Sequence, residues 1–432
     1  MDNSILINQW IKSLKENKLK RSYHHLDVPV DLKDPKNILY MKEKINNLEK
    51  HQFLPFIKSR KRVVKFKRKS KTEKIKSVKI RNIMYASHID AHIYAYYNFI
   101  LNKKYEEYIL KNNIQNSVIA YRKITLDDSE KGKSNIHFSK EVIEEIKSKK
   151  NCIVISVDIK SFFDNLDHVI LKKSLINILN SDKLDSDIYK IFKSLTKYKY
   201  IDHDVFITNK FKSIANQKGL FVFNSIKGSF KQNLTGIGIP QGSPISGLLS
   251  NIYLINLDLS VKNKKPDVFY RRYCDDIIFV CGLRDYDDLL DLISSVLLSL
   301  KLETQEKKTF VHFFKEDGEG VVRCDKITDR NGTVSNKKYL DYLGVEYDGS
   351  TRIRSSTLTN IRSKNLLRIK IQNKNLSFTK LKKPKTERSP STKKRNIYLD
   401  YAAKILPESS IGKQSLKIKK IANKYKGKIN NS

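Results

Sequence analysis

The spacing of apolar residues along the chain predicts a mixture of helices and strands. Residues 90–110 and 165–180 place apolar side chains at the three-to-four-residue spacing of a helix. Residues 150–159 instead form a continuous apolar run that contains Asp158 near its end, which indicates a buried strand with a carboxylate at its exit. Two short β-rich runs, 268–273 and 277–282, lie so close together that a tight hairpin is the simplest connection. The pattern indicates an α+β fold.

The remaining segments fill in this outline. Residues 1–57 have helical periodicity interrupted by a loop, and residues 236–244 (GIGIPQGSP) form a glycine-rich loop or tight turn. The run that follows, residues 245–262, is predicted to be one buried helix. Residues 287–302 form a strongly amphipathic helix that begins with acidic side chains, which oppose the helix dipole.

Charge narrows the choice of partner. The chain of 432 residues carries 85 Lys and Arg against 46 Asp and Glu, a formal net charge of +39. Such an excess favours a polyanion, and nucleic acid is the first candidate because neutralising phosphates releases counterions. A membrane surface is the alternative, weakened by the absence of an apolar run near the roughly 18 residues of a spanning helix. The first residues also lack the apolar core of a secretory signal, so we expect a cytoplasmic protein with no membrane partner.

Basic residues gather in two blocks, 58–81 and 352–428. Aromatic and β-branched residues inside the first block predict strands or a basic finger. The second block is either a surface that binds RNA phosphates or a partly disordered basic tail. The four cysteines show no CxxC spacing, and this argues against a zinc site or a disulfide framework.

Acidic pairs are the candidate chemistry, and most of them have an ordinary explanation. Asp287 and Asp288 begin the predicted helix 287–302, and residues 127–128 form a pair in a polar loop. The pair in the predicted hairpin turn, Asp275 and Asp276, has no such explanation. Two carboxylates about 4 Å apart repel by roughly 4 kcal/mol at an effective dielectric near 20, so a counter-charge is expected between them. With Asp158 on an adjacent strand, the three could hold two Mg²⁺ ions for phosphoryl transfer, with Mn²⁺ as the alternative ion.

Six motifs in order resemble those of reverse transcriptases, in particular the bacterial enzymes akin to group II intron and retron enzymes. VDIKSFFDNLDH (157–168), IPQGSPISGLLSNIYL (239–254) and YCDD (273–276) carry the resemblance. It extends upstream to KIRNI (79–83) and downstream to QEKKTF (305–310) and YLDYLGVEYDG (339–349). The resemblance covers residues 55–350 and implies a right-hand polymerase with fingers, a palm built on an antiparallel sheet, and a thumb.

The resemblance implies a role for each matching residue at the centre of the site. Asp158, Asp275 and Asp276 match the metal-binding triad of the family, and the backbone carbonyl of Ile159 matches a further metal ligand. Lys308 matches the lysine that protonates the leaving pyrophosphate, although the neighbouring Lys307 fits the same motif.

Further positions match residues that hold the incoming nucleotide and the primer. Phe163, with Phe162 beside it, matches the aromatic gate that collides with a ribose 2′-hydroxyl; the alternative is an ordinary core phenylalanine. Gly242 permits close backbone approach in the loop that packs against the nucleotide. The matching positions are, for the nucleotide, Lys79, Arg81, Phe162, Phe163, Gln241 and Gly242, and, for the primer-grip hairpin, Tyr342, Leu343 and Gly344. Lys79 has the alternative of a solvated lysine in a basic stretch.

The N-terminal motifs refine the resemblance. SYHHLDVPVDL (22–32), HQFLPFIKSRKR (51–62) and MYASHIDAHIYAYYN (84–98) are similar to the Abi and unknown-group lineage of defence-associated bacterial reverse transcriptases, most of all the class 2 type. That lineage implies a cytoplasmic bacterial enzyme that makes cDNA with deoxynucleotides from a structured noncoding RNA, as antiphage defence. The alternatives are an RNA-dependent RNA polymerase, an untemplated nucleotidyl transferase, or a non-catalytic RNA-binding protein.

The predicted domains follow from the same motifs. We expect a helical N-terminal extension at residues 1–57, fingers at 58–150, and a palm with a fingers insertion and the primer grip at 151–350. A basic thumb that binds RNA is expected at 351–432.

Overall fold

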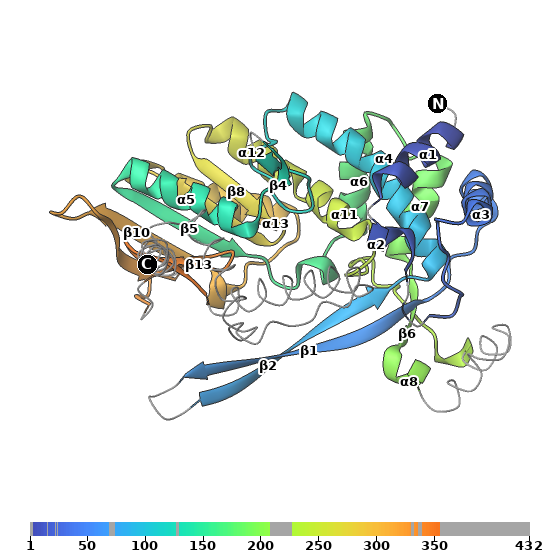
Figure 1. Cartoon of the computed structure of the whole chain (residues 1–432). Helices are drawn as coiled ribbons and strands as arrows, with labels where there is room; N and C mark the ends of the chain where they lie inside the picture. Colours follow the sequence, from blue (N-terminus) through green and yellow to red (C-terminus); the bar gives the residue numbers. More distant parts are fainter. Residues whose placement is uncertain are drawn as a thin grey trace, which may run out of the picture. The chain divides into compact units, whose positions relative to one another are not determined.

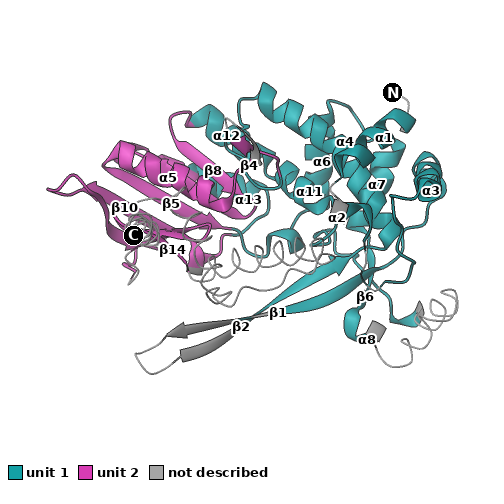
Figure 2. Ribbon diagram, in the orientation of Figure 1, with its two compact units in different colours: residues 1–121, 159–264, 292–303 teal, residues 122–158, 265–291, 304–432 magenta. Residues whose placement is uncertain are grey.

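The computed structural model describes residues 3–354 apart from residues 15, 22, 24, 69–73, 127–128, 208–226, 330–331 and 336–338. The chain divides into two compact units that interleave along the sequence (Figure 2). Unit 1 comprises residues 1–121, 159–264 and 292–303, and unit 2 comprises residues 122–158, 265–291 and 304–432. The limits of fingers, palm and thumb expected from the sequence stay predictions.

Unit 1 is mainly helical. Its long helix α4 begins after Ser87, whose side chain accepts a hydrogen bond from the Asp90 amide, and the aromatic rings of its inner face are buried. The helices and 3-10 turns of unit 1 are α1 (Asn3–Ser13), α2 (Glu16–Leu19), α3 (Pro35–Asn46), η1 (Leu48–Lys50), α4 (His88–Lys111), η2 (Phe162–Asp164), α6 (His168–Leu179), α7 (Ser186–Thr196), α8 (His203–Ile207), η3 (Lys227–Ser229), α11 (Ser246–Tyr253) and α12 (Ile255–Lys264).

A basic ribbon forms part of the sheet of unit 1. Strands β1 (Phe56–Arg68) and β2 (Lys74–Tyr85) pair in antiparallel fashion along their whole length (Figure 1). The base of β1 also pairs in parallel with β6 (Lys199–Asp202), which pairs with β7 (Lys231–Gln232). The predicted basic finger is therefore confirmed as a hairpin whose base is anchored in a sheet.

Unit 2 is built on a five-stranded antiparallel sheet with the order β11-β10-β5-β9-β8. Apolar side chains of β5 and β9 share a buried core with residues of α5 and of the small sheet β12-β13-β14. The elements are β3 (Thr125–Leu126), β4 (Ser129–Gly132), α5 (Asn135–Lys149), β5 (Cys152–Asp158), β8 (Phe269–Tyr273), β9 (Asp276–Cys281), η4 (Leu283–Asp285), η5 (Glu306–Lys308), β10 (Phe310–Glu316), β11 (Val322–Thr328), β12 (Leu340–Tyr342), β13 (Val345–Tyr347) and β14 (Thr351–Ile353). This is the antiparallel palm sheet that the motifs predicted.

Several predicted elements can be compared directly with the structure. The helix predicted over residues 287–302 is α13 (Tyr286–Ser299), with Asp287 and Asp288 in its first turn. The single helix predicted over residues 245–262 is wrong, because α11 and α12 are separated at Leu254. The pair at 127–128 and nearly all of the predicted thumb, residues 355–432, lie outside the described residues. In the described parts of the chain, no helix is long and apolar enough to cross a membrane.

Candidate active site

Two of the predicted metal ligands face each other across neighbouring strands. Asp158 ends β5 and is the direct cross-strand partner of Asp276, the first residue of β9. Side chains alternate between the faces of a strand, so both carboxylates project from the same face as the buried Val154 and Ile278. Directly opposed residues have Cβ atoms about 4.5–5.5 Å apart. On this face, the apolar side chains of β5 and β9 are followed by the two carboxylates, which lie at the same end of the paired strands.

The third carboxylate belongs to the turn between β8 and β9. Tyr273 pairs with Asp276, so the turn consists of only two residues, Cys274 and Asp275. Cys274 is buried and has a φ of 62°, the left-handed conformation that tight hairpin turns require at such a position. The predicted hairpin is confirmed, and the turn presents Asp275 next to the opposed pair.

The electrostatics show that the three carboxylates influence one another. Burial, and then the charge of Asp158, raises the pKa of Asp275. Burial together with repulsion from Asp275 and Asp158 raises the pKa of Asp276 to about 7. The Asp276 side chain is exposed to solvent, so repulsion from the neighbouring carboxylates contributes more to its raised pKa than burial does. The cluster of Asp158, Asp275 and Asp276 therefore favours the binding of a proton or a cation.

Lys308 supplies part of that charge. Its Nζ donates to Asp158 Oδ2 at 2.5 Å, and the backbone of the same segment is fixed because the Gln305 amide donates to the Asp158 carbonyl at 2.7 Å. Within the described residues, no three His, Cys, Asp or Glu side chains are arranged so that they could hold a metal ion as they stand. The carboxylate oxygens are nevertheless the ligand type that hard divalent cations select. Lys308 occupies Oδ2 of Asp158, so a cation at that oxygen would compete with the lysine.

The two phenylalanines after Asp158 have different surroundings within unit 1. Phe162 is 3% exposed, and its ring packs against Phe163 and Tyr253. Phe163 is only partly buried. Its carbonyl accepts a hydrogen bond from the Ile239 amide at 2.9 Å, which ties it to the glycine-rich loop. Burial makes Phe162 a packing residue, which disfavours its predicted contact with a nucleotide, whereas Phe163 remains accessible.

The glycine-rich loop is joined to the base of the basic hairpin. The Met84 amide of β2 donates to the Gln241 carbonyl at 2.8 Å. Gly242 has a φ of 121°, and a Cβ on it would lie 2.8 Å from the Met84 carbonyl oxygen and 3.0 Å from the Ile83 side chain. Gly242 thus approaches strand β2 closely within unit 1, and its predicted approach to the nucleotide stays a prediction.

The register of the hairpin separates its basic residues into two faces. Lys61 pairs with Arg81 and Val63 with Lys79, so Arg81 and Lys79 share a face with Ile83, the residue in contact with the loop. Arg60, Arg62 and their partners occupy the other face. Arg81 and Lys79 are both exposed. Lys79 and Arg81 therefore project from the face of β2 that carries Ile83, and the loop at Gln241 and Gly242 contacts β2 at Ile83 and Met84.

The predicted primer-grip residues form a second tight hairpin in unit 2. Tyr342 ends β12 and pairs with Val345, and the two turn residues, Leu343 and Gly344, have φ values of 47° and 94°. Tyr342 is 5% exposed, and its carbonyl accepts a hydrogen bond from Ser139 Oγ at 2.9 Å. Tyr342 is thus a core residue that fixes the hairpin against α5. Ile159 has a buried side chain, and the predicted role of its carbonyl stays a prediction.

The geometry agrees with a comparison against known protein families. Residues 93–347, more than half of the chain, match the family described as reverse transcriptase (RNA-dependent DNA polymerase). The chain belongs to the reverse transcriptase family. That family is described as one of RNA-dependent DNA polymerases, and this reverse transcriptase has a polymerase fold of mixed helices and sheets.

Solved structures similar to this reverse transcriptase are remote. Apo telomerase from Candida tropicalis is 14% identical with a TM-score of 0.40, over 73% of this chain and 52% of that one. Telomerase from Candida albicans in complex with a fragment of telomeric RNA is 13% identical with a TM-score of 0.39, over 86% and 64%. The RNA-dependent RNA polymerase of a human picobirnavirus is 9% identical with a TM-score of 0.38, over 83% and 57%. The reverse transcriptase spans about half the length of the first of these, and no curated protein matches it.

Two contacts around the site have no signal in the sequence. The bond between Met84 and Gln241 joins residues that are far apart along the chain, and it involves only backbone atoms. The hydrogen bond from Ser139 Oγ to the Tyr342 carbonyl joins residues that lie 203 positions apart in the sequence. Both position site residues through backbone atoms, which side-chain patterns do not reveal.

Proposed function

We propose that this reverse transcriptase copies a structured noncoding RNA into cDNA from deoxynucleotides, with two Mg²⁺ ions, as part of antiphage defence in the bacterial cytoplasm. The observation that carries the catalytic part is the opposition of Asp158 and Asp276 on one face of the sheet, with Asp275 in the adjoining turn. Three carboxylates whose mutual repulsion raises pKa values are suited to divalent cations. Mn²⁺ is the alternative ion.

The residues of the site divide the work of nucleotide addition. The cations supply charge that activates the primer hydroxyl and stabilises the leaving pyrophosphate. Asp158, Asp275 and Asp276 would hold them, with the Ile159 carbonyl as a further ligand. The Lys308 ammonium, whose Nζ lies 2.5 Å from Asp158 Oδ2, would donate a proton to the leaving pyrophosphate. Arg81 and Lys79 hold the triphosphate, a role suited to fixed positive charge.

The structured RNA and the defence role rest on the sequence. The net charge of +39 supports an RNA partner larger than one primer–template duplex. The N-terminal motifs support the defence lineage. The predicted RNA-binding thumb lies outside the described residues, so it stays a prediction.

Sequencing of the RNA and DNA that copurify with the protein from cells tests this proposal. We expect cDNA complementary to one structured RNA with the wild type, and none with the Asp275→Ala, Asp276→Ala double variant. The matched control is Asp287→Ala, Asp288→Ala, which removes an acidic pair from the first turn of α13 and leaves the triad intact. Equal cDNA from both double variants would show that the catalytic assignment is wrong, and ribonucleotide products would indicate an RNA polymerase.

A further inference from the structure

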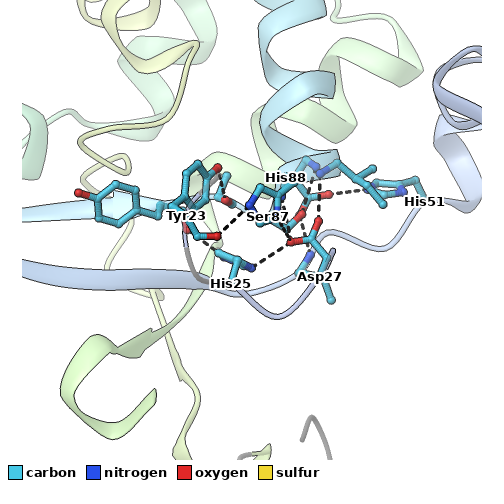
Figure 3. A network of polar contacts seen from close by, with 11 residues as sticks. Tyr23, His25, Asp27, His51, Ser87 and His88 are labelled. Atoms are coloured by element: carbon cyan, nitrogen blue, oxygen red, sulfur yellow. Dashed lines mark hydrogen bonds and ion pairs between the residues drawn. The ribbon is translucent and has the colours of Figure 1, made fainter. Parts of the chain in front are cut away.

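A buried network of polar side chains joins three segments of unit 1 that lie far apart in the sequence (Figure 3). The segments are residues 23–27, residues 51–54 and residues 85–90, where β2 passes into α4. Each belongs to one of the N-terminal motifs that the sequence singled out, and none contributes a carboxylate of the triad. The role of this network is therefore separate from metal binding.

Asp27 is the centre of the network. Its Oδ1 accepts hydrogen bonds from the His88 amide at 3.0 Å and from His88 Nδ1 at 2.8 Å, and its Oδ2 accepts from the Ile89 amide at 3.0 Å. These amides open helix α4, where unpaired N–H groups and the helix dipole favour an anion. Burial alone would raise the pKa of Asp27, but the hydrogen bonds from His88 and Ile89 lower it. Asp27 is thus an ionised cap on α4, supplied by the N-terminal segment.

The ring of His88 extends this connection. It is fully buried, stacks on Tyr23 with the centroids 4.6 Å apart, and has Nε2 2.9 Å from the Tyr23 carbonyl oxygen. Both atoms that face its nitrogens, Asp27 Oδ1 and the Tyr23 carbonyl oxygen, belong to the N-terminal segment, so the ring joins that segment to the first turn of α4. Removal of the Asp27 carboxylate would leave the buried His88 ring and the His88 amide without this acceptor.

The same N-terminal segment holds the end of β2. Tyr23 Oη donates to the Ala86 carbonyl at 2.8 Å, and His25 Nε2 lies 3.1 Å from the Tyr85 carbonyl oxygen. Burial lowers the pKa of His25 to about 4, so at neutral pH the ring is uncharged and donates from Nε2. Two consecutive carbonyls at the base of the hairpin are thereby fixed by side chains from the N-terminal segment.

The base of β1 is held by a second carboxylate of α4. Asp90 Oδ1 lies 2.7 Å from His51 Nε2, and Asp90 Oδ2 accepts from the Leu54 amide at 2.9 Å, two residues before β1 begins. Both strands of the basic hairpin are therefore tied at their bases to the first turn of α4. We call Tyr23, His25, Asp27, His51, His88 and Asp90 the hairpin brace.

We propose that the hairpin brace is a positioning element for nucleotide binding, which sets the direction of β1 and β2 and hence the place of Arg81. This inference rests on the proposed role of Arg81 in holding the triphosphate. Met84, which binds the Gln241 carbonyl, directly precedes the braced Tyr85, and Arg81 lies on the same strand. A two-stranded ribbon has little stability of its own, so its direction is set at its base.

Kinetics on a fixed primer–template test the brace. We expect Asp27→Asn to raise KM for deoxynucleotides about tenfold with a smaller change in kcat, because the triad is untouched and triphosphate contacts become misplaced. Hydrogen exchange at Met84 and Tyr85 should accelerate in the same variant. The matched control is Asp34→Ala, which removes the N-cap of α3 in the same N-terminal region and should lower Tm without changing KM.

A milder variant keeps the test valid if Asp27→Asn does not fold. Tyr23→Phe removes only the hydroxyl that binds the Ala86 carbonyl and keeps the ring on His88. It should give a smaller rise in KM, of about two- to threefold, and faster exchange at the end of β2. Equal KM values for the wild type and for every brace variant that folds would overturn the proposal, as would a change in KM for Asp34→Ala of the same size.

Arg81→Ala separates this proposal from the one on which it depends. A raised KM for Arg81→Ala with unchanged KM values for Asp27→Asn and Tyr23→Phe refutes the brace alone. An unchanged KM for Arg81→Ala refutes the proposed triphosphate contact, and the positioning role of the brace fails with it. Raised KM values for all three, with Asp34→Ala unchanged, support both.

Discussion

The Nζ atom of Lys308 lies 2.5 Å from Oδ2 of Asp158, so a lysine neutralises one of the carboxylates that we propose to hold a cation. Asp158 has little accessible surface, whereas about half of the Lys308 side chain is exposed. A lysine that is anchored only by its tip can leave Asp158 by rotating into solvent. Under the proposed function, a cation at Asp158 Oδ2 would compete with the Lys308 ammonium.

Replacement of Lys308 should separate cation binding from catalysis. Lys308→Ala removes the competitor at Asp158, so we expect divalent cations to bind more tightly, by about fivefold or less because a partly exposed ion pair has a small free energy. The same change should lower kcat by about a hundredfold if Lys308 protonates pyrophosphate. Titration with Mn²⁺ followed by electron paramagnetic resonance measures the first effect. Lys315→Ala, at an exposed lysine of β10, should change neither quantity.

The raised pKa of Asp276 predicts how the cation-free protein responds to pH. Its carboxyl has a pKa of about 7 in the folded protein and an ordinary value near 3.8 in the unfolded chain. Between these values the folded protein binds one proton more than the unfolded chain at this carboxyl. The contribution of Asp276 to the free energy of unfolding is therefore full below about pH 4 and is lost as the pH rises through 7. Thermal unfolding in a chelator should show this loss, and Mg²⁺ should reverse it most strongly above pH 7. Asp276→Asn should weaken the dependence and leave only the part due to Asp275, whose pKa is also raised, and an unchanged slope would contradict the assignment.

The two phenylalanines after Asp158 should have opposite phenotypes. Phe163→Ala should keep the fold and increase ribonucleotide incorporation relative to deoxynucleotide by about tenfold to a hundredfold, because the clash with the 2′-hydroxyl is lost. Phe162→Ala should instead lower the free energy of unfolding by about 3–5 kcal/mol, since a buried ring is replaced by a cavity. Incorporation assays and chemical denaturation distinguish the two. Equal use of both nucleotides by the wild type would exclude a gate at Phe163.

The palm could be predicted from the sequence because its signals are local. An apolar run that ends in Asp158 and two β-rich runs around Asp275 and Asp276 each define a strand or turn within a few residues. Antiparallel pairing then leaves little freedom in how the carboxylates meet. The break between α11 and α12 at Leu254 was missed because the apolar pattern continues through it.

The hairpin brace could not be predicted, because its contacts join residues that are far apart in the sequence. Asp27 and His88 are polar and lie 61 residues apart, so nothing in either local pattern indicates that they are buried against each other. The choice between Phe162 and Phe163 was also open, because it depends on the short 3-10 turn that follows Ser161, whose φ is 47°. Burial of polar groups and irregular backbone are set by long-range contacts, which periodicity does not record.

Gly242 tests whether the loop and the hairpin act together. A methyl group on this residue would lie 2.8 Å from the Met84 carbonyl oxygen, and its φ of 121° is a conformation that L-residues rarely adopt. We expect Gly242→Ala to destabilise the protein by about 1–3 kcal/mol. Because the strain falls on β2, KM for deoxynucleotides should rise as well. Gly228→Ala is the matched control, since nothing lies within 4 Å of its Cβ position. If Gly242→Ala lowers stability and leaves KM unchanged, the contact between the loop and β2 is structural alone, and Arg81 does not depend on it.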